Sequence, residues 1–178
     1  MAPVAGIFSL AMVLSDGLFK NQSKDSMEKV LQPKVMALRN LDLISREFCP
    51  DLEYFVAFSS VISGRGNVGQ TNYGYANSYM ERLCEIRRSE GLPALAIQWG
   101  AVADIGSAAQ KFDNEVLLSK GWAGTVPQRI HSCLSLMNHF LRSNESVVSS
   151  LLRFEPKVDE KDLKRDIQSV ISNVLGMI

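Results

Sequence analysis

The sequence predicts an α/β fold in which helices cover a parallel sheet. Short apolar runs alternate with longer segments of helical periodicity along the 178 residues, and this alternation is typical of parallel sheets. The run at 4–12 is apolar at nearly every position, as strands buried on both faces are. The length is sufficient for one domain.

The elements follow in order along the chain. We expect strands at 4–12, 54–60, 93–98 and 146–153, helices at about 25–48, 72–89, 127–142 and 160–176, and lid-like helices at about 107–119. Pro33 interrupts the first helix and should kink it. Gly91 and Pro93 are typical of the residues that follow a helix C-terminus, so we expect the second helix to end before them. The charged segment around Pro156 is typical of a linker.

Composition excludes several classes of function. Lysine plus arginine and aspartate plus glutamate number 19 each, so the formal net charge is zero; this argues against a nucleic-acid or anionic-membrane partner. The three cysteines are scattered without a C-x-x-C pair, so we expect neither a metal site nor disulfides. A reducing, cytoplasmic location fits. His131 and His139 are interpreted as surface or packing residues.

The most informative segment runs from Ser59 to Asn77. Ser60 stands 13 residues before Tyr73, and Asn77 follows Tyr73 by four. The strand end would present Ser60, and the next helix would present Tyr73 and Asn77 on one face. This arrangement could bring a hydroxyl donor and a phenol acid to one carbonyl oxygen. The 13-residue spacing favours Ser60 over its neighbour Ser59.

These residues resemble the active-site segment of a ketoreductase domain of the short-chain dehydrogenase/reductase superfamily, and specifically that of animal-type fatty acid synthases. Three further segments support the resemblance: 32–42, which contains Lys34, 87–106 and 124–130. Polyketide synthase ketoreductases share the Lys, Ser, Tyr and Asn pattern. The runs GRGN and EGLPALAIQWGAVADIG favour the fatty acid synthase.

The resemblance implies NADPH-dependent reduction of a β-ketoacyl thioester, carried on a carrier-protein arm within a multidomain synthase. Tyr73 would donate the proton, and Ser60 would hydrogen-bond the carbonyl oxygen. Lys34 would hold the nicotinamide ribose and lower the pKa of Tyr73, and Asn77 would order the proton relay. Tyr73 would also contact the cofactor.

One further cofactor contact is implied at the first strand. Ser9-Leu10-Ala11 stands where fatty acid synthases commonly have Asn-Leu-Ala, which implies cofactor-side contacts at Ser9 and Ala11. The apolar run from Pro3 to Leu14 could also imitate a signal peptide. It lacks a basic segment, and the resemblance places a core strand there.

The dinucleotide fingerprint is matched by Gly64, Gly66 and Gly69, but the acidic residue that should end the following strand is missing. The resemblance places these glycines in the loop before Tyr73. It also implies three more β-α units before Val4. The expected fold is therefore a partial Rossmann-like, doubly wound parallel sheet, the second half of a short-chain reductase, with an incomplete NADPH site.

Two domains are expected from the resemblance. Residues 1–155 would be the C-terminal part of a ketoreductase domain, and 156–178 a linker and the first helix of a truncated acyl carrier domain. The Asp-Ser-Leu attachment motif is absent from the sequence, so no phosphopantetheine could be attached. We expect such a fragment to be nearly inactive alone. The alternatives are a non-catalytic structural or interaction module and a ketoreductase of a polyketide synthase.

Overall fold

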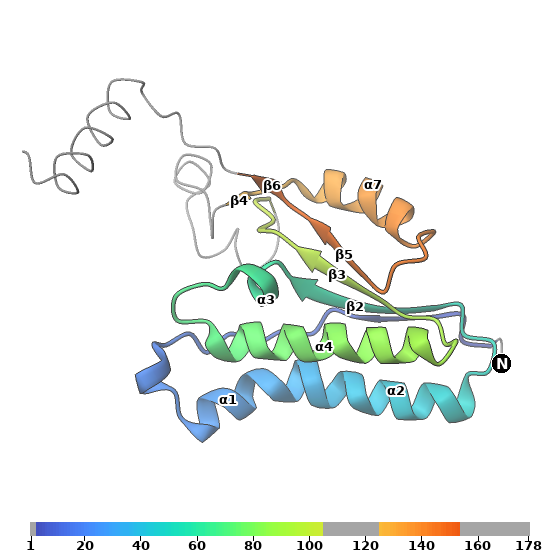
Figure 1. Cartoon of the computed structure of the whole chain (residues 1–178), viewed down its shortest axis with the longest axis horizontal. Helices are drawn as coiled ribbons and strands as arrows, with labels where there is room; N and C mark the ends of the chain where they lie inside the picture. Colours follow the sequence, from blue (N-terminus) through green and yellow to red (C-terminus); the bar gives the residue numbers. More distant parts are fainter. Residues whose placement is uncertain (1–2, 105–124, 154–178) are drawn as a thin grey trace, which may run out of the picture.

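A four-stranded parallel sheet forms the centre of the molecule. The computed structural model describes residues 3–104 and 125–153 (Figure 1). The strands are β1 (Gly6–Ser9), β2 (Tyr54–Ser60), β3 (Leu95–Trp99) and β5 (Val147–Ser150), in the spatial order β1-β2-β3-β5. Ser60 lies opposite Trp99 in the register, so the carboxyl ends of β2 and β3 are level.

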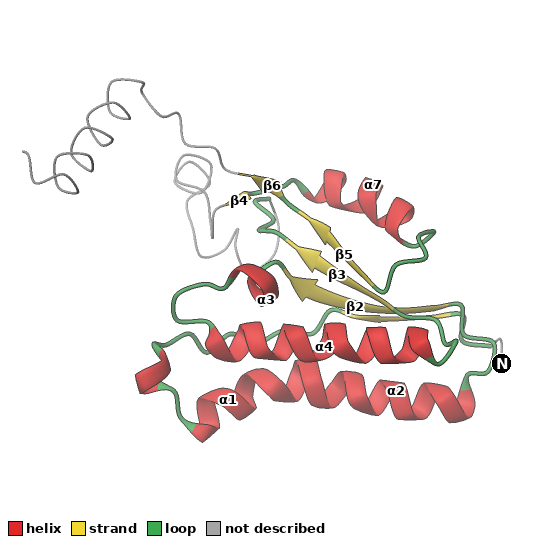
Figure 2. Cartoon of the chain, viewed as in Figure 1, coloured by secondary structure: helices red, strands yellow, loops and turns green. Residues whose placement is uncertain are grey.

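Helices cover both faces of this sheet, as Figure 2 shows. α1 (Lys24–Leu31), α2 (Ala37–Phe48) and α4 (Thr71–Ser89) lie on one side, and α7 (Ile130–Phe140) lies on the other. Phe55 and Ala96 pack against Met80 on the α4 side. Val56 and Ile97 pack toward α7 on the opposite side. This arrangement is the doubly wound α/β fold that the sequence predicts.

The segment around Pro33 is a π-helical turn between α1 and α2. This turn spans Gln32–Met36, and the backbone remains helical on both sides of it. Pro33 has no N–H to donate, and a π turn adds one residue to the helix without ending it. The first long helix is therefore confirmed. The expected interruption takes the form of a widened turn that buries Lys34 and Val35.

Some boundaries differ from the sequence-based prediction. β1 is four residues long and lies at an edge of the described sheet. A four-residue helix, α3 (Ile62–Arg65), follows β2 and was not expected. The last predicted strand divides into β5 and β6 (Leu152–Arg153), and β6 pairs antiparallel with β4 (Thr125–Val126). The expected lid at 107–119, the domain boundary and the last helix lie outside the described residues.

Candidate active site

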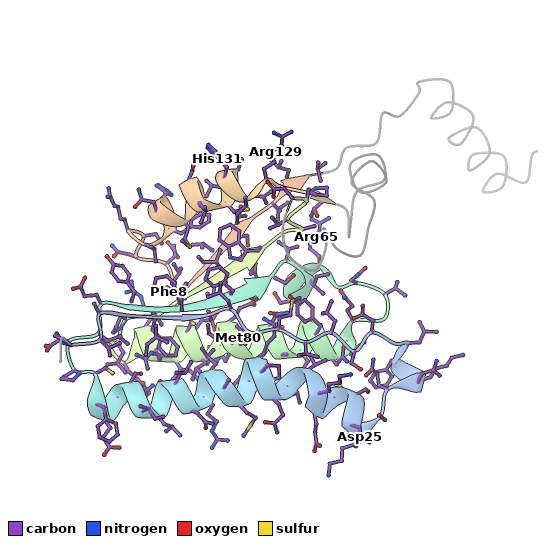
Figure 3. All side chains as sticks on the ribbon, turned by 180° about the vertical axis from the view of Figure 1, so that it is seen from behind. Phe8, Asp25, Arg65, Met80, Arg129 and His131 are labelled. Atoms are coloured by element: carbon purple, nitrogen blue, oxygen red, sulfur yellow. The ribbon has the colours of Figure 1, made fainter. Side chains whose placement is uncertain are left out.

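The carboxyl ends of β1, β2 and β3 border a cavity of about 590 Å³. Lys34, Ser60 and Tyr73 all line it, although they come from the π turn, the end of β2 and the start of α4. Apolar side chains make up most of the wall, among them Phe8, Phe58, Trp99, Ile130 and Met137. Figure 3 shows Phe8 on the face of the sheet opposite α4. Ligands of open α/β sheets bind at this edge.

Lys34 is buried, with 2% of its surface exposed. Its Nζ donates a hydrogen bond of 2.9 Å to the carbonyl oxygen of Phe58 and lies 3.8 Å from the Met80 sulfur. It also lies 5.3 Å from the centre of the Tyr73 ring. Burial lowers the pKa of Lys34 to about 8, and the charge of Glu81 acts in the opposite direction.

Tyr73 lies in the first turn of α4 and is 9% exposed. Burial raises its pKa, while hydrogen bonding by Asn77 and Ser60 acts to lower it. The net direction is upward because removal of the phenolate from water outweighs these polar contacts. The lowering of this pKa by Lys34 stays a prediction. The Tyr73 hydroxyl lies 3.5 Å from the Met12 sulfur.

Ser60 and Ser59 have different surroundings. Ser60 ends β2, and its Oγ accepts a 3.3 Å hydrogen bond from the Ile62 N–H. The Ser59 hydroxyl donates to the Glu81 carboxylate instead. Both serines line the cavity. Of the two, only Ser60 forms a hydrogen bond that acts to lower the pKa of Tyr73. The structure is thus consistent with the choice of Ser60.

Asn77 lies one helical turn after Tyr73 and is fully buried. Its Nδ2 donates a 2.8 Å hydrogen bond to the backbone oxygen of Tyr73. Its Oδ1 has no hydrogen-bond partner, which is uncommon for a buried amide oxygen. Asn77 is not part of the cavity wall; it lies behind Tyr73 and contacts that residue.

The two residues expected at the cofactor side, Ser9 and Ala11, do not line the cavity. Their neighbours Phe8, Leu10 and Met12 do, so this segment presents apolar side chains to the cavity. The roles of Ser9 and Ala11 stay predictions. Sequence reasoning missed Met12 and Glu81. Glu81 could have been found, because it lies eight residues after Tyr73 and so on the same helix face.

Of the three glycines in the run, Gly64 lies in α3, and Gly66 and Gly69 lie in the loop between α3 and α4. Gly66 and Gly69 have φ angles of 74° and 80°, which glycine adopts without steric cost. The Gly17 N–H donates a 2.8 Å hydrogen bond to the Gly69 oxygen. The loop is thus fastened to the 15–22 segment, as expected for a connection before Tyr73.

Neither a metal site nor a membrane span is found in the part of the chain that the structure describes. No group of three or more metal-ligating side chains occurs among residues 3–104 and 125–153. No helix within those same ranges is both long and apolar enough to cross a bilayer.

A protein-family comparison identifies the family. The model of the KR domain matches residues 1–104. The chain belongs to the KR domain family. Solved ketoreductases share the fold: an A1-type ketoreductase has a TM-score of 0.78 at 26% identity. A-type ketoreductases from a modular polyketide synthase give 0.77 at 28%. Each comparison covers 86% of this chain and 31% of the other.

Curated relatives of this KR chain are large synthases. Hybrid PKS-NRPS synthetase lepA of Aspergillus flavus is 47% identical over 111 residues, 62% of this chain and 3% of its own length. Highly reducing polyketide synthase cm3B of Cordyceps militaris is 32% identical over 162 residues, 90% of this chain and 6% of its own length. The chain therefore spans a small part of the relatives it matches.

These comparisons correct one part of the sequence-based prediction, the class of synthase that the ketoreductase resembles. The ketoreductase fold and family are confirmed. An animal-type fatty acid synthase is not specifically supported, and the polyketide synthase alternative fits the relatives better. The Lys, Ser, Tyr and Asn pattern is shared by both classes, so the preference for a fatty acid synthase rests on the runs GRGN and EGLPALAIQWGAVADIG. The relatives that this chain matches do not support that preference.

Proposed function

We propose that this chain carries the catalytic residues of an NADPH-dependent β-ketoacyl thioester reductase in a polyketide-synthase-like multidomain enzyme. The observation that supports this proposal is the shared cavity of Lys34, Ser60 and Tyr73, in a chain of the KR domain family. The substrate would be an acyl thioester presented by a carrier protein. A cytosolic location remains our expectation, since all three cysteines are free.

The proposed chemistry divides between the chain and its cofactor. NADPH, when bound, would supply the hydride. The Ser60 hydroxyl would donate a hydrogen bond to the substrate carbonyl oxygen, which stabilises negative charge as it develops. Tyr73 would donate its proton to that oxygen. The largely apolar wall would keep bulk water away from both groups.

Lys34 and Asn77 would support the proton donor. The Lys34 ammonium has three N–H groups, and the described contacts use two of them, so one fits a ribose hydroxyl. The unpartnered Oδ1 of Asn77 could accept from a water of the proton relay. With the pKa of Lys34 at about 8, most of this lysine is charged at neutral pH.

Turnover with a Tyr73→Phe variant tests the proposal. The chain would be supplied with the preceding segment of a polyketide synthase ketoreductase, because it spans 31% of the solved ketoreductase chains. NADPH oxidation with a β-ketoacyl thioester should fall by at least about 100-fold in Tyr73→Phe, as expected for loss of a general acid.

Tyr75→Phe is the matched control for this assay. Tyr75 is 55% exposed on the same helix, so its hydroxyl should be dispensable and the rate should stay within about twofold. Equal rates for Tyr73→Phe and the unaltered chain would contradict the proposed role of Tyr73. No NADPH oxidation by the complemented domain would favour the non-catalytic alternative.

A further inference from the structure

Glu81 occupies the same face of α4 as Tyr73 and Asn77. It follows them by eight and four residues, which is two turns and one turn of a helix. The residue is half-buried. It is not one of the four residues assigned to the reaction above, yet its carboxylate faces the end of β2.

The Glu81 carboxylate binds the residues on both sides of Ser60. It accepts a hydrogen bond from the Ser59 hydroxyl and another, of 2.6 Å, from the Ser63 hydroxyl. The Ser63 Oγ also lies 2.8 Å from the backbone oxygen of Ser60. The strand end and the first turn of α3 are therefore tied to α4 around Ser60.

Gln98 and Ser149, two residues of the sheet, extend this set of hydrogen bonds. Gln98 of β3 donates a 3.0 Å hydrogen bond from Nε2 to the Ser63 Oγ. The Ser149 hydroxyl of β5 donates to the Gln98 Oε1 at 2.5 Å. Glu81 thus ends a polar network that joins four elements, α4, α3, β3 and β5. A carboxylate at that end is a stronger acceptor than a neutral group.

Glu81 also places a negative charge near Lys34. Burial disfavours the Lys34 ammonium, and the Glu81 charge favours it. The other groups that face the Lys34 Nζ are the Phe58 carbonyl, the Met80 sulfur and the Tyr73 ring. Tyr73 is the titratable group among them, and burial keeps it in the neutral form.

We propose that Glu81 is a positioning residue of the reductase site: its hydrogen bonds with Ser59 and Ser63 hold the end of β2 in place. That strand end carries Ser60 and the Phe58 carbonyl that accepts from Lys34. This inference rests on the proposed function and adds a fifth residue to it. Glu81 does not line the cavity, so it acts through Ser60 and Lys34 and does not touch the substrate.

The charge effect can be tested in this chain without cofactor or turnover. Glu81→Gln keeps an acceptor oxygen and removes the charge. An NMR titration of the Lys34 ε-methylene group, assigned with Lys34→Arg, should show a lower midpoint pH in Glu81→Gln than in the unaltered chain. The titration does not depend on reductase activity. The proposal for Glu81 and the proposed function can therefore be contradicted independently.

Two variants serve as controls for the titration. Glu85→Gln removes a carboxylate one turn further along α4, where Glu85 pairs with the exposed Arg82; the Lys34 midpoint should not move. Glu81→Asp keeps the charge, and the midpoint should stay closer to that of the unaltered chain than to that of Glu81→Gln. The same midpoint in Glu81→Gln and the unaltered chain would overturn the charge role.

The effect on Ser60 needs a separate measurement. The Ile62 N–H donates to the Ser60 Oγ, so its hydrogen exchange reports on the strand end. We expect at least tenfold faster exchange of this amide in Glu81→Ala than in Glu85→Ala. Equal protection in both variants would overturn the positioning of Ser60 by Glu81.

Discussion

Lys34 is a buried lysine, and its burial disfavours the charged form of the side chain. A fall in its pKa from 10.5 to about 8 corresponds to about 3 kcal/mol of differential interaction between its two protonation states. The Lys34 ammonium has one neutral oxygen and one sulfur as hydrogen-bond partners. These partners compensate little for the hydration that the ammonium loses on burial. A cost of this size at a cavity wall is typical of a functional residue.

Lys34→Met should change the pH dependence of stability. Between pH 8 and about 10 the unfolded chain binds more protons at this lysine than the folded chain, so the contribution of Lys34 to stability rises with pH. Below pH 8 it destabilises the fold by up to about 3 kcal/mol. In Lys34→Met the rise should disappear, and stability at pH 7 should increase.

Urea unfolding at pH 7, 8, 9 and 10 would measure this effect. Lys29→Met is the control, because Lys29 is exposed on α1 and should leave the slope unchanged. An equal rise of stability with pH in Lys34→Met and the unaltered chain would mean that Lys34 is not buried as described.

The sequence predicts that Lys34, Ser60 and Tyr73 lie close together, and these three line one cavity. It does not predict their ionisation. The 13-residue spacing between Ser60 and Tyr73 reflects a strand end, a turn and a helix start, which local patterns reveal. The pKa of Tyr73 depends on burial by residues far along the chain, such as Met12. The contacts of Glu81 with Ser59 and Ser63 likewise needed the fold.

Arg87 connects α4 to α2 at the scale of whole elements. It is 1% exposed, pairs with Asp42 at 2.5 Å, and lies 4.0 Å above the Phe55 ring. Arg87→Met would leave the Asp42 carboxylate buried with Arg46 as its remaining cation. We expect a loss of about 3 kcal/mol, the lower end for a broken buried pair.

Chemical unfolding of Arg87→Met and Arg82→Met would test this role. The Arg82 side chain is 72% exposed and pairs with Glu85 on the same helix, so its loss should cost less than about 1 kcal/mol. Similar losses in the two variants would show that the Arg87 pair does not hold the helices together.

Gly69 fixes the loop that leads into α4. Its φ of 80° costs a residue with a Cβ about 1–2 kcal/mol, and a Cβ there would lie 3.5 Å from the Gly17 nitrogen. Gly69→Ala should therefore lower the free energy of unfolding by about 1 kcal/mol or more.

Gly64→Ala is the matched control, measured by the same thermal or urea unfolding. A Cβ at Gly64 meets nothing within 4 Å, and its φ lies outside the left-handed region. If Gly64→Ala destabilised the chain as much as Gly69→Ala, the left-handed turn would not be the cause.

Elements with strong periodicity were predicted well, and short or irregular ones were not. β2 was placed at its observed bounds, and α4 differs from the expected helix by one residue at its start. The π turn was missed because Pro33 signals only that the α-helical ladder changes. No local sequence pattern predicts the two-residue pairing of β4 with β6.

The whole molecule leaves one side of its sheet thinly covered within the described ranges. Phe8 in the edge strand β1 is 43% exposed, and Val4 and Leu10, just before and after this strand, are 49% and 59% exposed. Apolar edges of this kind favour pairing or burial by further structure. The cavity opens beside this edge, so the reductase site and the exposed strand belong to the same region of the molecule.

Transfer of deuterium from NADPH to the product is the most direct test of the central claim. The complemented domain would be given NADPH labelled at either C4 position and a β-ketoacyl thioester. We predict one deuterium at the β-carbon of a β-hydroxyacyl product from one of the two labels, by mass spectrometry, and almost none with Tyr73→Phe. A β-keto substrate recovered unchanged with both labels would contradict the claim that this chain supplies a reductase site.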